Sequence, residues 1–176
     1  MKLTSCLVNP RACRETELNY NKVLKSKRIA VVGAGPAGIS FSITAAQRGH
    51  VVSLFEESNE IGGQLNFAKI IPGKEEFHGL LNYYKNEIKR LKIDLISDHK
   101  VKTTDLINFD EIIISTGVVP RKIDIEGQDK VNFVYDYQEV FNDGVKLGNR
   151  IAIIGAGGIG FDVAEYISSS GISPTL

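Results

Sequence analysis

The sequence has no tryptophan, one methionine and only two cysteines among its 176 residues. Cys6 and Cys13 are too few for a disulfide scaffold and too few to hold a metal cluster alone. The three histidines, His50, His78 and His99, are scattered and have no partners at the spacing of a metal site or a catalytic triad. We therefore assign none of them a role.

Excess charge and long apolar runs are also missing. The 21 basic and 21 acidic residues cancel, so we expect neither nucleic acid nor an anionic membrane as a partner. No apolar run approaches the roughly 20 residues of a membrane span, and the N-terminus lacks the apolar core of a signal peptide. The expectation is a cytoplasmic protein with room for one domain, or one and a fragment.

What the sequence does contain, from residue 28 to residue 56, is the set of parts of a dinucleotide-binding βαβ unit in the right order. Ile29 to Val32 is a short apolar run, typical of a strand buried on both faces of a parallel sheet. The G-x-G-x-x-G turn that follows allows close backbone approach to a pyrophosphate and close packing of a helix on the strand. Its candidate binding residues are Gly33, Gly35, Pro36, Ala37 and Gly38. We expect the pyrophosphate to lie on the amides at the N-terminus of that helix.

A second strand and an acidic residue complete the unit. Val51 to Phe55 is the strand, and Glu56 ends it, 18 residues after Gly38. A carboxylate there accepts hydrogen bonds from the ribose hydroxyls of an adenosine, so a free 2′-hydroxyl is expected, not a 2′-phosphate. A glycine turn alone also occurs for purely geometric reasons, but here strand, turn, helix, strand and acidic residue occur together.

The other expected elements follow from periodicity and turn residues. Residues 1–27 are expected to form an irregular arm. Helices are expected at 39–47, capped by Gly49, and at 74–91; short strands at 93–96 and 100–102; a buried strand at 109–117; and a strand with a short helix at 131–140. The pair Gly62-Gly63 either lets backbone approach a ligand closely or forms a flexible turn.

The apolar run and glycine turn that begin the βαβ unit recur 122 residues later. A second apolar run leads into Gly155, Gly157, Gly158 and Gly160, spaced like the first turn. We interpret the repeat as a second dinucleotide site. The chain is expected to end before this unit's second strand. Because one strand and one helix cannot bury their apolar faces alone, residues 150–176 are expected to be the least stable segment. Their apolar side chains (Ile151, Ile153, Ile154 and Phe161) are expected to be exposed or packed opportunistically.

Together these segments resemble a known family, the flavoproteins in which an FAD domain is interrupted by an NAD(P)H domain. The resemblance covers residues 27–176. It rests on Gly33-Ala-Gly-Pro-Ala-Gly38, Glu56, Gly62-Gly63-Gln64, Ser115-Thr-Gly-Val-Val-Pro120 and Gly155-Ala-Gly-Gly-Ile-Gly160. It implies a truncated, Rossmann-like α/β fold. The predicted domains are an arm (1–26), the N-terminal segment of the FAD domain (27–148) and the first βα unit of an NAD(P)H domain (149–176).

More specifically, residues 4–13, 71–77 and 155–162 resemble bacterial NADPH-dependent 2,4-dienoyl-CoA reductases, oxidoreductases of fatty acid β-oxidation. In those flavoproteins an N-terminal barrel carries FMN, and a [4Fe–4S] cluster held by four cysteines links FMN to FAD. The resemblance implies electron flow from NADPH through FAD, the cluster and FMN to an unsaturated acyl-CoA. It also implies that Cys6 is one ligand of the cluster and that Cys13 is not a ligand.

The resemblance further implies which residues contact the cofactors. Gly63, Gln64, Val101, Thr116 and Gly117 would line the path from the adenosine towards the flavin of FAD, and the second glycine turn would hold NADPH. No catalytic residue is assigned. The barrel, the other three cluster ligands and the rest of the NAD(P)H domain are expected outside this chain, so a separately encoded barrel and cluster segment is a predicted partner.

Two alternatives stay open. Among enzymes, trimethylamine dehydrogenase and NADH oxidase are flavoproteins of similar design. Outside enzymes, the chain is interpreted as a non-catalytic remnant or an adenine-nucleotide-binding module, which would hold the ADP half of FAD without chemistry. In each case the isolated chain is expected to be inactive.

Overall fold

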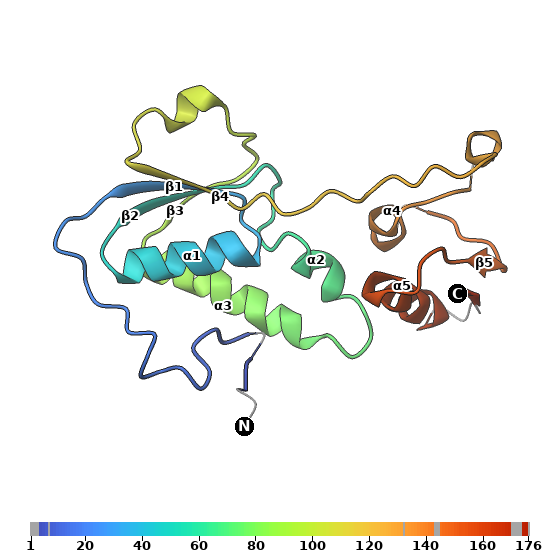
Figure 1. Ribbon diagram of the computed structural model, residues 1–176, viewed down its shortest axis with the longest axis horizontal. Coiled ribbons are helices and arrows are strands. Elements are labelled where there is room, and N and C mark those ends of the chain that lie inside the picture. Colours follow the sequence, from blue (N-terminus) through green and yellow to red (C-terminus); the bar gives the residue numbers. More distant parts are fainter. Residues whose placement is uncertain (1–3, 7, 132, 143–144, 170–173, 176) are drawn as a thin grey trace. The chain divides into compact units, whose positions relative to one another are not determined.

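The computed structural model describes residues 4–6, 8–131, 133–142, 145–169 and 174–175. Strands and helices alternate along the chain, as the sequence predicted (Figure 1). The chain divides into two compact units. The first contains the described residues up to Gly63 together with Gly79–Gly117, and the second contains Gln64–His78 and the described residues from Val118 onward. The domain boundaries drawn from the sequence remain a prediction.

The first unit is built on a four-stranded parallel sheet with the order β3-β2-β1-β4. Its strands are β1 (Arg28–Val32), β2 (Val51–Phe55), β3 (Asp94–Ile96) and β4 (Glu111–Ile114). The connections from β1 to β2 and from β2 to β3 run in one direction, so right-handed crossovers put their helices on one face. Figure 1 shows α1 (Pro36–Gln47) and α3 (Glu76–Arg90) on that face. The direction reverses between β1 and β4, which is where open α/β sheets bind ligands.

The helices have the apolar faces that their sequences predicted. Helix α1 buries small and branched residues, among them Gly38, Ile39 and Ala45. It ends at Arg48, and Gly49, with φ +99°, donates its N–H to the Ala46 carbonyl at 3.0 Å, which confirms the predicted glycine cap. Helix α3 buries the residues expected from its period, Leu80, Leu81, Tyr84 and Ile88 in the first unit. Among the described residues, no helix combines the length and the apolar character needed to cross a bilayer.

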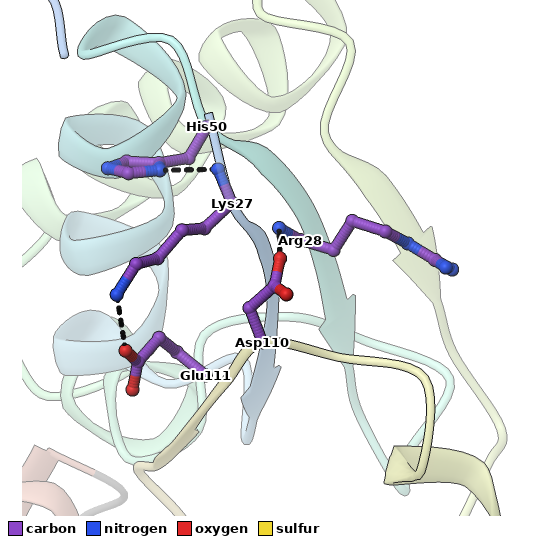
Figure 2. Close-up of polar contacts among 5 residues, drawn as sticks. All are labelled: Lys27, Arg28, His50, Asp110 and Glu111. Carbon is purple, nitrogen blue, oxygen red and sulfur yellow. Dashed lines mark hydrogen bonds and ion pairs between the residues drawn. The ribbon is translucent and has the colours of Figure 1, made fainter. Parts of the chain in front are cut away.

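Polar contacts fasten the amino ends of β1, β2 and β4 (Figure 2). The N–H of Arg28 donates to Asp110 Oδ2 at 2.7 Å, and the Arg28 carbonyl accepts from the Asp110 N–H at 2.8 Å. Lys27 Nζ lies 2.6 Å from Glu111 Oε1, and the Lys27 N–H donates to His50 Nδ1 at 3.2 Å. These contacts set the register of the strands at the edge opposite their carboxyl ends.

The prediction that the strand within 109–117 is buried was wrong. Strand β4 forms, but the side chains of Ile112 and Ile114 are 44% and 67% exposed. The reason is the position of β4 in the sheet. Among the described residues it is an edge strand that pairs only with β1, without the second neighbour that a central strand has.

Two shorter predicted strands are also absent from the described residues. Residues 100–102 lead instead into a 3₁₀ helix, η1 (Thr103–Leu106), because the Lys102 N–H donates to Asp105 Oδ2 at 2.8 Å and closes a turn. Residues 131 and 133–136 join no strand; residue 132 lies outside the described residues. The short helix predicted after them is present as α4 (Tyr137–Phe141), and Asp136 caps it by accepting the Glu139 N–H at 2.9 Å.

The second unit contains α2 (Leu65–Ala68), η2 (Gln128–Lys130), α4, β5 (Ile151–Ala152), α5 (Gly158–Ser169) and β6 (Pro174–Thr175). Strand β6 pairs in parallel with β5, so the expectation that the chain ends before a second strand was wrong. The twelve-residue helix α5 is long enough to carry the chain back alongside β5.

A small core holds the second unit together. Ile71, Phe141, Val163 and Ile167 are buried, and Ile151 and Ile153 pack against them. Residues 64–75, which come before α3 in the sequence, therefore supply apolar surface to the strand and helix of the second glycine turn. Ile154 and Phe161 stay 67% and 57% exposed. Of the four side chains expected to be exposed or packed opportunistically, two are exposed, and Ile151 and Ile153 pack against this core.

The burial pattern of β2 generates a stability prediction. Leu54 is fully buried, whereas Val51 on the same strand is 61% exposed. Leu54→Ala should lower the free energy of unfolding by about 2–5 kcal/mol, because the truncation leaves a cavity in the core. Val51→Ala should change it by less than about 0.5 kcal/mol, since surface truncations seldom cost more. Urea unfolding measures both, and equal losses would contradict this account of the sheet.

Candidate functional site

The first glycine turn is a place where three backbone segments meet without side chains between them. Gly33 has φ +103°, and its N–H donates to the Phe55 carbonyl at 2.8 Å. A Cβ added to Gly33 would overlap the Ser115 carbonyl, and one added to Gly38 would overlap the Gly33 carbonyl. Both glycines are therefore required by the close crossing of β1, α1 and the end of β4.

Ser115 fixes this crossing from β4. Its Oγ lies 2.9 Å from both the Val32 and the Gly33 carbonyl oxygens, so its one proton is shared between two acceptors. Its N–H donates to Val32 at 2.8 Å. In the sequence Ser115 stands out only as part of a motif, and this contact was not predicted. The signal was a small residue directly after a strand that neighbours β1.

The N-terminus of α1 presents backbone donors to open space. Gly35 is the N-cap residue in an extended conformation, no side chain caps the helix, and Pro36 occupies its first turn. A Cβ on Gly35 would meet nothing within 4 Å, and Pro36 and Ala37 are exposed. Amides left free at the start of a helix are a ready site for a phosphate group.

Glu56 reaches this turn from the end of β2. Its Oε2 accepts the Ala34 N–H at 2.8 Å, and its Oε1 accepts the Ser58 N–H at 3.0 Å and the Ser58 hydroxyl at 2.9 Å. An ionised carboxylate has about four lone-pair directions, of which these contacts use three, so Oε2 keeps acceptor capacity for a ribose hydroxyl. The predicted ribose reader is thus held against the predicted phosphate turn.

The pair Gly62-Gly63 packs on the same turn. The Gly62 N–H donates to the Ala34 carbonyl at 2.7 Å, and a Cβ on Gly63 would lie 3.2 Å from Gly35 Cα. Both residues have positive φ. Of the two interpretations, close backbone approach is the one that the geometry favours. Gln64, the next residue, belongs to the second unit, where its Nε2 lies 3.0 Å from the Tyr137 hydroxyl.

The remaining predicted FAD contacts lie at carboxyl ends of the sheet. Thr116 and Gly117 follow Ser115 and are exposed. Val101 is half-buried in a segment tied to β2 by the His99 N–H, which donates to the Glu56 carbonyl at 3.0 Å. That segment is closed by Asp105, which accepts from the Lys102 N–H and pairs with His99 Nε2 at 2.8 Å. These two contacts hold the pKa of Asp105 below its usual value, and the hydrogen bond from the Lys102 N–H contributes more than the contact with His99.

The second glycine turn repeats the backbone of the first. Gly155 has φ +118°, and a Cβ on Gly160 would overlap the Gly155 carbonyl, as at Gly33 and Gly38. Gly157 and Gly158 have open space around them, and helix α5 begins at Gly158. The geometry of the turn therefore suits a second dinucleotide phosphate group.

The predicted cluster ligand stands apart from both turns in the sequence. Cys6 is exposed, and its Sγ accepts the Asn9 N–H at 3.4 Å; this bond and one from Val8 lower the pKa of the thiol. Within the part of the chain that the structure describes, no three His, Cys, Asp or Glu side chains are grouped to hold a metal ion. A [4Fe–4S] cluster needs four thiolates, so the two cysteines of this chain do not fit one unaided.

Comparison with known proteins agrees with this geometry. The family model described as "Pyridine nucleotide-disulphide oxidoreductase" matches residues 27–176. The chain belongs to this family. It is an FAD- and NAD(P)-binding oxidoreductase domain of the Rossmann-like α/β class found in flavoprotein reductases. In this pyridine nucleotide-disulphide oxidoreductase domain, the first turn and Glu56 fit the ADP half of a dinucleotide.

Individual relatives are longer than this chain. A metal reductase of Desulforamulus reducens is 34% identical over 97% of this chain and 26% of its own length. A cinnamate reductase of Clostridium sporogenes is 31% identical over 98% of this chain and 26% of its own length. The solved structure of a 2-naphthoyl-CoA reductase complex superposes with a TM-score of 0.88, at 34% identity, over 96% of this chain and 26% of that one. The chain thus spans about a quarter of these relatives.

The close crossing at Gly38 predicts an asymmetry between two glycine substitutions. Gly38→Ala should abolish FAD binding, because the added Cβ overlaps the Gly33 carbonyl and must displace α1 from β1. Gly79→Ala should leave binding unchanged, because a Cβ there meets nothing within 4 Å. Titration of both variants with FAD, monitored by flavin fluorescence, checks the pair. Full binding by Gly38→Ala would contradict the described turn.

The carboxylate at the end of β2 generates a second prediction. Glu56→Ala should weaken FAD binding about ten- to hundredfold, because the loss of a charge-assisted hydrogen bond to the ribose costs about 1.5–3 kcal/mol. Glu57→Ala, a change at an exposed neighbour, is the control. Ser58→Ala removes the hydroxyl contact to Glu56 without removing the carboxylate, so it should weaken binding far less. An unchanged dissociation constant for Glu56→Ala would refute its role.

Proposed function

We propose that this chain is the FAD-binding portion of an NADPH-dependent reductase of conjugated, unsaturated acyl-CoA substrates, of the 2,4-dienoyl-CoA reductase type. The observation that carries the proposal is the joining of the Gly33–Gly38 turn to Glu56 through the Ala34 N–H. This joining supports an anion site and a ribose acceptor at the reversal point of the sheet. The names of two relatives support the substrate class, since 2-naphthoyl-CoA is a conjugated acyl thioester and cinnamate a conjugated acid.

Different residues of this chain would hold different parts of FAD. The free amides at the start of α1 bind the pyrophosphate, and Glu56 orients the ribose. Gly63, Thr116 and Gly117 leave room for the extended part of the molecule because they carry little or no side chain near it. Val101 would line the path from the adenosine towards the flavin. Bound FAD supplies the capacity to accept a hydride from NADPH and to release electrons one at a time.

The second turn would hold NADPH in the same way. Gly155, Gly157, Gly158 and Gly160 give it the required backbone, and α5 supplies the free amides. Electrons would leave FAD towards a [4Fe–4S] cluster and FMN carried by other segments, with Cys6 as one cluster ligand. The exposure and the lowered pKa of Cys6 support this role, because the thiolate is the form that binds metals.

The isolated chain should bind FAD and yet catalyse no NADPH-dependent reduction of a dienoyl-CoA. Hydride transfer needs the nicotinamide within about 3.5 Å of the flavin, and a displacement of about 1 Å costs about a hundredfold in rate. A cluster relay needs four thiolates, whereas the chain has two cysteines. The test is a visible spectrum of the desalted protein, followed by an assay with FAD, NADPH and a dienoyl-CoA.

The outcomes separate the alternatives. A retained flavin spectrum without turnover supports the proposal. ADP binding as tight as FAD binding would favour an adenine-nucleotide-binding module instead, because the flavin half would then add nothing. The absence of both FAD and ADP binding would refute the proposal. Turnover clearly above that of free FAD would refute the dependence on other segments.

A further inference from the structure

An ion pair joins two distant segments of the second unit beside the second glycine turn. Lys74 Nζ lies 2.5 Å from Asp162 Oδ1, although the residues are 88 positions apart. Lys74 lies in the loop between α2 and α3, and Asp162 lies on α5, four residues after its first residue, Gly158. The two side chains are about one-third exposed. Neither residue has been assigned a role in the sections above.

Asp162 is poorly placed for a protein that binds an anion at this helix. A carboxylate close to the start of a helix is stabilised by the helix dipole when the site is empty. It repels a phosphate bound to the amides one turn away. From Ile151 to Phe161 no side chain carries a charge, so this stretch contains no cation of its own to offset Asp162.

The position of Lys74 is fixed by the core of the unit. Its N–H donates to the Ile71 carbonyl at 3.1 Å, and the Ile71 side chain is 3% exposed among residues that include Val163 and Ile167 of α5. Val163 is the neighbour of Asp162 in the sequence. The loop is therefore anchored to the same helix that carries the carboxylate. Because the backbone at Lys74 is already ordered, the ion pair costs only the entropy of ordering the side chains.

We propose that Lys74 is a positioning residue for the nicotinamide dinucleotide: its ammonium neutralises Asp162, so that the second turn can accept a pyrophosphate. The proposal rests on the proposed function of that turn. It differs from a purely structural role in one respect. If the ion pair served only to hold the loop on α5, loss of either partner would harm binding equally. If charge is what matters, loss of the two partners has opposite effects.

The experiment measures the dissociation constant of NADPH for the full chain and four variants by calorimetry at low salt. Lys74→Met leaves Asp162 unbalanced and should weaken binding about fivefold, which corresponds to about 1 kcal/mol. Asp162→Asn should leave binding unchanged or tighten it, and the double variant should return close to the unmodified chain. Lys74→Arg keeps the charge and should also bind normally. The differences should shrink at high salt, because these side chains are partly exposed.

The dissociation constant of FAD, measured on the same samples, separates this inference from the proposed function. FAD binding should be equal in all variants, because neither residue belongs to the first turn. Weaker NADPH binding by Asp162→Asn, or unchanged binding by Lys74→Met, would overturn the inference. So would an unmodified chain that binds FAD and not NADPH. If Lys74→Met fails to fold, Asp162→Asn still decides, since the structural and the charge roles predict opposite directions for it.

Discussion

The close crossing of β1, α1 and the end of β4 is the constraint on which the first unit depends. It exists because Gly33 and Gly38 have no Cβ, and Ser115 fixes it by sharing one proton between two carbonyl groups. The other contacts of the site are made next to this crossing. Glu56 reaches in to the Ala34 N–H, and the Gly62 N–H bonds to the carbonyl of the same residue. A single alanine turn residue therefore receives a contact from each of two loops, and the site is preorganised before any ligand binds.

The second unit shows that the same backbone design needs different support. Around the first turn, β1 and α1 are buried by the other strands of a four-stranded sheet and by α3. Around the second, β5 and β6 are two residues each, so most of the burial comes from α4 and from residues 64–78. Phe67, Ile70 and Ile71 precede α3 in the sequence, yet their side chains complete the core under α5. The segment that carries Lys74 thus contributes to the core that supports the second glycine turn.

Local signals in the sequence were sufficient for the parts of the fold that local chemistry decides. The glycine turns, the strands β1 and β2, the cap at Gly49 and the apolar face of α3 each follow from a few adjacent residues. Nothing near Ile112 and Ile114 shows that β4 lies at the edge of the sheet, because strand pairing and burial depend on distant residues. The error at Val101 is of another kind: Asp105 accepts the Lys102 N–H only three residues away, so a local turn signal was missed. The Lys74–Asp162 ion pair spans 88 residues, so no periodicity or motif in either segment predicts it.

A carboxylate lies near each of the two glycine turns, and the two carboxylates have different partners. Glu56 is held by two backbone N–H groups and a hydroxyl, from Ala34 and Ser58, which keep its charge in place as an acceptor. A ligand that offers hydroxyl groups can then satisfy the rest of its capacity. Asp162 is held by a cation instead, and an ion pair offers a ligand little net charge. Under the proposed function the carboxylate of Glu56 contacts its ligand, whereas that of Asp162 is neutralised by Lys74. A carboxylate group would therefore serve recognition at one turn and need neutralisation at the other, and the difference lies in the partners that the fold brings to each.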